Sequence, residues 1–268
     1  MADPLAPRIA TLTGQPVTEL RPLHGGDLSQ VVCATLANGT RVVAKTGPLV
    51  TVEAAMLTAI ARAGCAAPQV IGTQDSLLVM EHIPETKASD AGWAALGRDL
   101  RKLHDSTGDS YGWPDDYAFG PAPIPNATLA DWPSFWAKRR LLAFVGDLPA
   151  DIAQRVEALC ARLLGLIPAR PPAAVLHGDL WSGNVIFTGD GACLIDPACY
   201  HGDAEVDLAM LHLFGTPPAA FHDAYGPLEP GWQDRRAAYT LWPALVHLRL
   251  FGVSYRGLVA GCLSALGA

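Results

Sequence analysis

A short, turn-rich stretch in the second half of the sequence carries the side chains best suited to catalysis. Asp179 and Asn184 lie five positions apart in the run HGDLWSGN at 177–184, and Asp196 follows twelve positions after Asn184. Phosphoryl transfer from a nucleotide uses one carboxylate to accept the proton of the attacking hydroxyl, and an amide with a second carboxylate to bind Mg²⁺. Oxygen ligands suit this hard, strongly hydrated ion. The spacing therefore predicts Asp179 as a catalytic base, and Asn184 and Asp196 as Mg²⁺ ligands of an ATP-dependent kinase.

Taken singly, these residues are also ordinary turn signals, because Gly, Asp, Asn and Pro occur in loops of every kind. The complete set is more specific. It matches the kinase catalytic loop H-x-D-x-x-x-x-N at each fixed position, from His177 to Asn184. We therefore interpret the three residues as one constellation.

The same part of the chain resembles the fructosamine-3-kinase (ketosamine kinase) family. The resemblance rests on HGDLWSGN at 177–184, LIDPACY at 194–200 and GDAEVDLAM at 202–210. This family belongs to a wider group of aminoglycoside phosphotransferases and choline kinases, which share only the HGD…N…D skeleton and whose fold resembles that of protein kinases. The similarity extends roughly from Leu23 to Gly257, which is nearly the whole chain.

The resemblance implies an α+β, two-lobed protein-kinase-like fold. A small antiparallel sheet lobe at 1–83 would bind the nucleotide, and a larger, mostly helical lobe at 84–268 would hold the catalytic and acceptor-binding residues. The implied reaction transfers phosphate from ATP to the sugar 3-hydroxyl of a ketosamine (fructosamine or ribulosamine), free or on a glycated protein, as deglycation repair. Two alternatives remain. One is a kinase of another small hydroxyl compound, such as an aminoglycoside or choline, and the other is an inactive nucleotide-binding scaffold, which the intact catalytic positions disfavour.

The first part of the chain has the pattern of the expected sheet. A first strand is predicted from residue 18 to the glycine turn at 24–27. The run at 29–36, rich in β-branched residues, and its partner at 41–45 flank Asn38-Gly39, a strong hairpin signal, and two more short strands at 69–73 and 76–81 complete a five-stranded sheet. A helix is predicted at 49–63, where apolar residues keep helical spacing.

Several residues of this lobe are predicted to bind ATP. VVAK at 42–45 resembles the kinase strand whose lysine contacts the α- and β-phosphates, so Lys45 is assigned that role and Glu53 is expected to orient Lys45. Gly25 and Gly26 lie where a kinase folds its glycine-rich loop over the phosphates, although a Gly-Gly pair is also typical of a tight turn. Three residues occupy the position of the hinge that binds adenine through its backbone: Glu81, His82 and Ile83.

The second lobe is predicted to be mostly helical, with helices at 91–107, 132–144 and 151–166, a hairpin at 185–195, and further helices after residue 217. The segment 108–133, with its prolines and aromatics, either shapes the acceptor pocket or wraps the domain. Asp207 is expected to begin a helix that runs to Phe214, as its N-cap, and Asp203, Glu205 and Asp207 are interpreted as scaffold rather than metal ligands.

Trp181 is the loop residue that separates this sequence from more distant relatives. We predict that its indole contacts the acceptor, since an aromatic face suits both a sugar ring and a protonated amine. A buried packing role is the alternative. Four further residues after position 217 are expected to pack or to line the acceptor side: Trp232, Trp242, His247 and Arg249.

The composition and charge of the chain limit the kinds of partner and the location that we expect. The net charge of −7 provides no basic surplus for nucleic-acid binding. The first residues show no signal-peptide pattern, and the most apolar stretch, 241–253, is too short to span a bilayer. The six cysteines form no metal-ligand spacing and are expected to be core residues. We expect a cytoplasmic protein, a monomer or weak dimer, with no nucleic-acid or membrane partner.

Overall fold

The computed structural model describes residues 5–23 and 30–268. Gly25 and Gly26, which the sequence assigns to the phosphates of ATP, lie outside these residues. None of the helices in the described ranges combines the length and the hydropathy that a membrane span requires.

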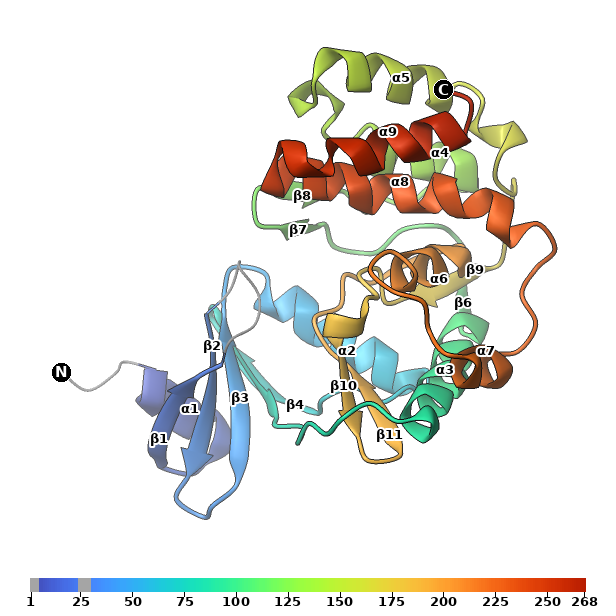
Figure 1. Cartoon of the computed structure of the whole chain (residues 1–268). Helices are drawn as coiled ribbons and strands as arrows, with labels where there is room; N and C mark the ends of the chain where they lie inside the picture. Colours follow the sequence, from blue (N-terminus) through green and yellow to red (C-terminus); the bar gives the residue numbers. More distant parts are fainter. Residues whose placement is uncertain (1–4, 24–29) are drawn as a thin grey trace.

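The N-terminal part is a five-stranded antiparallel sheet with one helix on each face (Figure 1). Its strands follow the spatial order β1-β2-β3-β5-β4, and their bounds are Val17–Pro22 for β1, Gln30–Leu36 for β2, Arg41–Thr46 for β3, Val70–Gln74 for β4 and Leu77–Glu81 for β5. Side chains alternate between the two faces of a strand. On β5, Val79 therefore packs toward α1 (Leu5–Thr13), while Leu78 packs toward α2 (Val50–Arg62).

This alternation sets the position of Lys45. Val43 and Lys45 of β3 share one face of the sheet, and Val43 packs in the cluster that includes α2. Lys45 therefore points toward α2 and toward the rest of the molecule. Helix α1 was not predicted from the sequence, and its Leu5 and Ile9 cover the opposite face.

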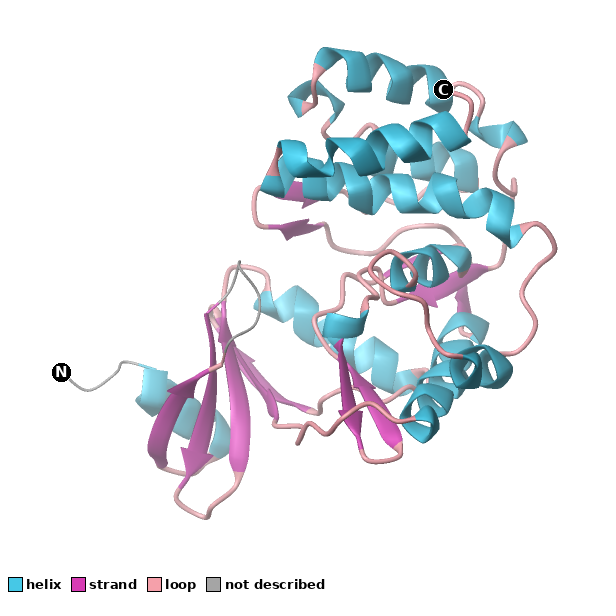
Figure 2. Cartoon of the chain, in the orientation of Figure 1, coloured by secondary structure: helices cyan, strands magenta, loops and turns pink. Residues whose placement is uncertain are grey.

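The larger part is mostly helical (Figure 2). Its long helices are α3 (Asp90–Asp105), α5 (Ala150–Cys160), α8 (Trp232–Phe251) and α9 (Arg256–Ala265), and its short ones are α4 (Trp132–Trp136), α6 (Glu205–Leu211) and α7 (Ala219–Tyr225). Three small sheets lie among them: β6 (Thr107–Gly108), β9 (Ala173–Leu176) and β12 (Tyr200–Gly202); β7 (Tyr117–Phe119) and β8 (Ala122–Ile124); β10 (Val185–Thr188) and β11 (Gly191–Leu194). The predicted fold class is confirmed.

The extended segment between β5 and α3 joins the sheet to this helical part. The proposed lobe boundary at 83/84 falls within this segment. Ser89 caps α3, accepting a hydrogen bond from the backbone N–H of Gly92 at 3.0 Å.

Several predicted helix boundaries are wrong. The helix expected at 91–107 is α3, which ends at Asp105, and Thr107 belongs to β6. The helix expected at 132–144 is α-helical only as far as Trp136, and a π-helical turn then covers Ala137–Leu141, where the Leu142 N–H donates to the carbonyl of Ala137. The helix expected at 151–166 is α5, which ends at Cys160 and is followed by the 3₁₀ turn Leu163–Gly165. Asp207 does not cap α6, because the helix begins at Glu205 and ends at Leu211.

Candidate active site

The catalytic loop follows β9 and depends on a glycine at one point. Gly178 has φ = +81°, and a Cβ atom there would lie 2.0 Å from the carbonyl oxygen of Ala198. No other residue fits without moving that backbone. Leu180 anchors the next part of the loop, because its side chain is fully buried in the cluster formed with α3 and the β10–β11 hairpin.

Asp207 of α6 holds the loop from behind. Its fully buried carboxylate accepts hydrogen bonds from the backbone N–H groups of His177 at 2.7 Å and Gly178 at 2.9 Å. His104 of α3 lies 3.2 Å from the same carboxylate and bonds Tyr225 through its other ring nitrogen. Asp207 therefore joins the loop to α6 and α3 by side-chain bonds rather than by capping a helix.

Asp203 and Glu205, the two other acidic residues near Asp207, also contact side chains of the protein. Asp203 accepts from the Tyr239 hydroxyl at 2.6 Å, and Glu205 is paired with the guanidinium of Arg235 at 2.8 Å. These contacts agree with the scaffold role expected for both residues.

Asp179 and Asn184 contact each other directly. The Asn184 side-chain N–H₂ group donates to the Asp179 carboxylate at 2.9 Å and to the Asp179 backbone carbonyl at 2.8 Å. Burial raises the pKa of Asp179 to about 7, against the smaller opposing effect of the Asn184 hydrogen bond. A carboxylate with this pKa is well matched to accepting a proton near neutral pH.

The β10–β11 hairpin brings Asp196 back to Asn184. The Ile195 N–H donates to the Asn184 carbonyl at 3.1 Å, which extends the hairpin by one further pair. His177 fixes the other side, since its Nε2–H donates to the Ile195 carbonyl at 2.9 Å. Asp196 itself adopts φ = +52°, a left-handed conformation that Asp tolerates better than most residues.

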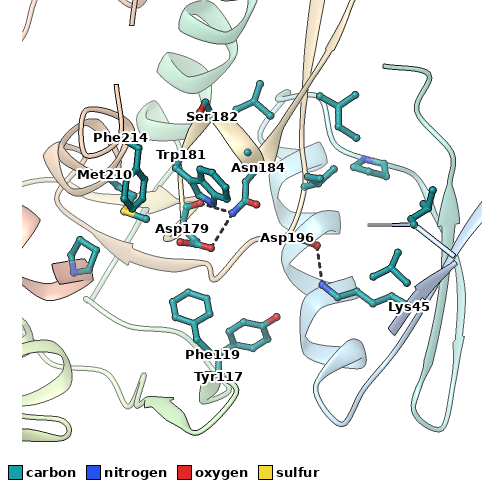
Figure 3. A pocket seen from close by; sticks show the side chains of 18 of the residues that line it. Lys45, Tyr117, Phe119, Asp179, Trp181, Ser182, Asn184, Asp196, Met210 and Phe214 are labelled. Atoms are coloured by element: carbon teal, nitrogen blue, oxygen red, sulfur yellow. Dashed lines mark hydrogen bonds and ion pairs between the residues drawn. The ribbon is translucent and has the colours of Figure 1, made fainter. Parts of the chain in front are cut away.

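Lys45 joins the sheet to this loop (Figure 3). Its ammonium lies 2.8 Å from Glu53 of α2 and 2.8 Å from Asp196. Lys45 and Glu53 are both buried. Burial alone would lower the pKa of Lys45, but the two carboxylates raise it above the ordinary value, so the side chain stays charged. The structure therefore brings Glu53 and Lys45 together in a buried ion pair.

The donor set suits Mg²⁺. The Asn184 N–H₂ group is occupied by Asp179, which leaves its amide oxygen available, and Asp196 contacts Lys45 through Oδ1, which leaves Oδ2. Both free atoms are oxygens, the ligands that Mg²⁺ prefers. A bound Mg²⁺ would neutralise phosphate charge between these two side chains.

One continuous cleft of about 1030 Å³ connects these groups to the predicted hinge. Glu81, His82 and Ile83 all line it at the end of β5. Apolar side chains form the walls of this half of the cleft, where the sequence predicts the nucleotide: Leu23, Val31, Val43, Met80, Val185, Ile186 and Ile195. Within the described part of the chain, the site residues predicted from the sequence thus border the cleft. Glu53 is the exception, because it contacts Lys45 from behind the cleft wall.

Aromatic side chains border the other half of the cleft. Figure 3 shows Tyr117 and Phe119 across from Trp181 and Phe214, with Asp179 between the two pairs. Trp181 is 37% exposed, and its indole covers Gly183, where a Cβ atom would lie 2.2 Å from the ring. This exposure contradicts the alternative in which Trp181 is a buried packing residue.

The segment 108–133 has both of the roles considered from the sequence. Tyr117 and Phe119 of β7 line the cleft, whereas Tyr111 is buried against Trp132. Tyr117 also donates to Glu53 at 3.4 Å, a contact that the sequence reasoning missed. The high aromatic content of the segment was the available signal, but no sequence pattern relates Tyr117 to Glu53.

The four residues expected to pack or line the acceptor side divide into two groups. Trp242 and His247 of α8 border the cleft. Arg249 instead pairs with Asp147, and Trp232 packs against His212, so both are structural.

The model of the fructosamine kinase family matches residues 1–266. The chain belongs to the fructosamine kinase family. It is 35% identical to a probable ketoamine kinase of Synechocystis sp., over 94% of this chain and 92% of that protein, and 35% identical to another of Thermus thermophilus, over 91% and 92%.

Solved structures agree with this assignment. A Thermobifida fusca protein assigned as a fructosamine-3-kinase superposes with a TM-score of 0.92 at 34% identity, covering 98% of both chains. The gentamicin complex of the aminoglycoside phosphotransferase APH(2″)-IIa superposes with a TM-score of 0.64 at 15% identity, covering 99% of this chain and 96% of the other, and so shares the fold. Family and fold together make this fructosamine kinase family member a phosphotransferase.

Proposed function

We propose that the chain transfers the γ-phosphoryl group of ATP to the 3-hydroxyl of a ketosamine. The observation that carries the proposal is the constellation at one point of the cleft: Asp179 bonded to Asn184, and Lys45 held between Glu53 and Asp196. A phosphoryl-transfer site needs these three elements: a base, oxygen ligands for a metal, and a cation for the phosphates.

The nucleotide would lie between the hinge and Lys45. Adenine would occupy the apolar half of the cleft, with hydrogen bonds to the backbone of residues 81–83, and Lys45 would bind the α- and β-phosphates. Asn184 and Asp196 would hold Mg²⁺ there, and the ion would offset the charge that develops on the phosphate oxygens. We also keep Gly25 and Gly26 as the proposed cover of the phosphates.

Asp179 would act on the acceptor. As the sugar oxygen forms its bond to the γ-phosphorus, the bond from that phosphorus to the β–γ bridging oxygen breaks and ADP leaves. The hydroxyl proton passes to the Asp179 carboxylate, and Asn184 keeps this group in place through its 2.9 Å hydrogen bond. Trp181 would contact the sugar or its protonated amine from the opposite side.

The charge of the acceptor half favours a ketosamine over the aminoglycoside alternative. Only Asp179 and Asp196 are acidic among the described residues that line this half, and both already have catalytic roles in the proposal. A polycationic aminoglycoside would find few carboxylates to pair with. A ketosamine, with one protonated amine and a polyol, suits aromatic walls.

Deglycation would follow from the product. A 3-phosphate on a ketosamine is an unstable ester, and its loss as inorganic phosphate would lead to release of the free amine. The family resemblance motivates this step. We also propose a cytoplasmic location, which suits the six free cysteines.

The experiment is a measurement of ADP release with Mg²⁺-ATP and a panel of acceptors. We expect release with a fructosamine or ribulosamine and background rates with an aminoglycoside, choline or no acceptor. Phosphorus NMR should place the new ester on the 3-hydroxyl, and an assay for free amine should detect its later release. Release of ADP that is faster with choline or an aminoglycoside than with any ketosamine would refute the proposal.

A further inference from the structure

Four rings form a continuous surface in the acceptor half, which we call the aromatic wall: Phe214, His247, Phe251 and Tyr255. The His247 ring centroid lies 5.3 Å from that of Phe214, 5.4 Å from that of Phe251 and 4.9 Å from that of Tyr255. Phe214 also contacts Trp181 edge-to-face at 5.8 Å. The wall is therefore continuous with the catalytic loop, and its member Phe214 lies on the side of Asp179 away from Lys45 (Figure 3).

The wall carries no charge. The acidic residues among the described lining of the cleft are Glu81, Glu85, Asp179 and Asp196, and none of them belongs to the wall. Arg249, on the same helix as His247, is tied to Asp147 and to the Pro121 carbonyl. Burial lowers the pKa of His247, against the smaller opposing effect of the hydrogen bond that its Nδ1–H donates to the Pro243 carbonyl at 2.7 Å.

The wall also leaves apolar area open to solvent. Phe214 and Phe251 are each 49% exposed, although large aromatic side chains are usually covered. Apolar area next to a binding site favours ligands that cover it, and aromatic rings gain further from edge-to-face or offset contacts. A sugar next to Asp179 cannot itself provide such a surface, but the group attached to its amine can.

We infer that the aromatic wall is a subsite for the carrier group of the ketosamine, and that it selects an aromatic or long alkyl amine over small, carboxylate-bearing or polycationic ones. The inference rests on the proposed function, because it assigns the part of the acceptor beyond the phosphorylated sugar. It makes Phe214, Phe251 and Tyr255 specificity-determining residues.

The test compares fructosamines that differ only in the carrier: 2-phenylethylamine, ethylamine, phenylalanine and spermine. We expect kcat/KM for the phenylethyl compound to exceed that for the ethyl compound by about tenfold or more, as for burial of one phenyl group. The phenylalanine and spermine compounds should both fall below the phenylethyl compound. Phe251→Ala should reduce the phenylethyl-to-ethyl ratio to within about threefold of one.

Leu164→Ala is the matched control, since Leu164 is 70% exposed but does not line the cleft. It should keep the wild-type ratio. Equal kcat/KM for the four fructosamines, or an unchanged ratio in Phe251→Ala with an unchanged melting temperature, would overturn the subsite alone. No turnover with any fructosamine would overturn the proposed function and this inference with it.

A second copy of the chain is the competing occupant of the wall. Sedimentation velocity separates the two cases, because we propose a monomer or weak dimer. A stable wild-type dimer that Phe251→Ala converts to monomer, while Leu164→Ala does not, would overturn the subsite in favour of an interface.

Discussion

The hydroxyl of Tyr117 donates a hydrogen bond to Glu53 at 3.4 Å, across the boundary between the helical part and the sheet. Glu53 in turn holds Lys45 at 2.8 Å, while the Tyr117 ring lines the acceptor half of the cleft. The same side chain therefore lines the cleft and contacts the carboxylate that is paired with Lys45. We propose that Tyr117 positions this pair and so couples the two halves of the cleft.

Replacing Tyr117 by Phe removes this hydrogen bond but keeps the ring. We expect kcat/KM for the ketosamine to fall about fivefold, which corresponds to about 1 kcal/mol, the usual net value of one hydrogen bond. Steady-state kinetics measure the change in kcat/KM, and a thermal melt measures any change in stability separately. Tyr111→Phe is the control, because it removes a hydroxyl bonded to the Pro171 carbonyl in the same segment, away from the cleft. An equal loss of kcat/KM in both variants would mean that Tyr117 has no specific role.

Asp196→Asn should weaken the metal and the nucleotide together. The carboxylate contacts Lys45 and, in the proposed function, would also offer its second oxygen to Mg²⁺, so its charge would support both cations at the phosphates. We expect the Mg²⁺ concentration for half-maximal activity and the Kd for ATP each to rise about tenfold or more, as measured by Mg²⁺ titration and calorimetry. Asp190→Asn, at the exposed tip of the same hairpin, should change neither. Normal Mg²⁺ dependence in Asp196→Asn would exclude the ligand role.

Activity should not require phosphorylation of the protein. Many protein kinases carry an arginine before the catalytic Asp that pairs with an activation-loop phosphate. Here that position is Gly178, where no side chain fits, and residues 197–206 contain no Ser or Thr. Tyr200, the one hydroxyl side chain of that segment, is fully buried. Protein from bacteria, shown by mass spectrometry to be unphosphorylated, should be fully active, and a requirement for an upstream kinase would contradict this.

Trp181→Leu tests the acceptor contact. Leu keeps much of the apolar bulk but loses the aromatic face, so kcat/KM for the ketosamine should fall about tenfold or more, or roughly 1.4 kcal/mol. Because Trp181 is 37% exposed, the melting temperature and the KM for ATP should hardly change. Trp93→Leu gives the opposite case, since Trp93 packs against Phe187 and Phe221 and should mainly affect stability. A lower melting temperature with an unchanged ketosamine KM in Trp181→Leu would identify it as a packing residue only.

The sequence predicted that the proposed catalytic residues lie together, because they are close in the chain or follow a known pattern. Asp179, Asn184 and Asp196 are joined by one loop and one hairpin, and the register of β10 with β11 determines their proximity. Lys45 and Glu53 were recognisable from a strand followed by a helix. The five strands of the first lobe follow from β-branched runs and turn signals, which are local features.

Contacts between distant segments could not be predicted in this way. Asp207 was expected to cap a helix, but its carboxylate is drawn to the backbone N–H groups of the catalytic loop thirty residues earlier, because these buried donors need an acceptor. The aromatic wall combines Phe214 with residues of α8 and the turn after it, which only tertiary packing brings together. The π-helical turn at Ala137–Leu141 was not predicted either, and its Arg140 lies over the ring of Tyr200, sixty residues further along the chain, at 3.8 Å.

Ketosamine-dependent ADP release, measured side by side for the wild-type protein and Asp179→Asn, tests the central claim most directly. Asn lacks the carboxylate that would accept the proton in the proposed function, while Lys45 and its two partners remain, so ATP should still bind. We expect the wild type to release ADP only with a ketosamine, and Asp179→Asn to lose a factor of roughly 10²–10⁴ in turnover with little change in the Kd for ATP. Wild-type ADP release that ignores the ketosamine, or an Asp179→Asn rate within about tenfold of wild type, would contradict the account.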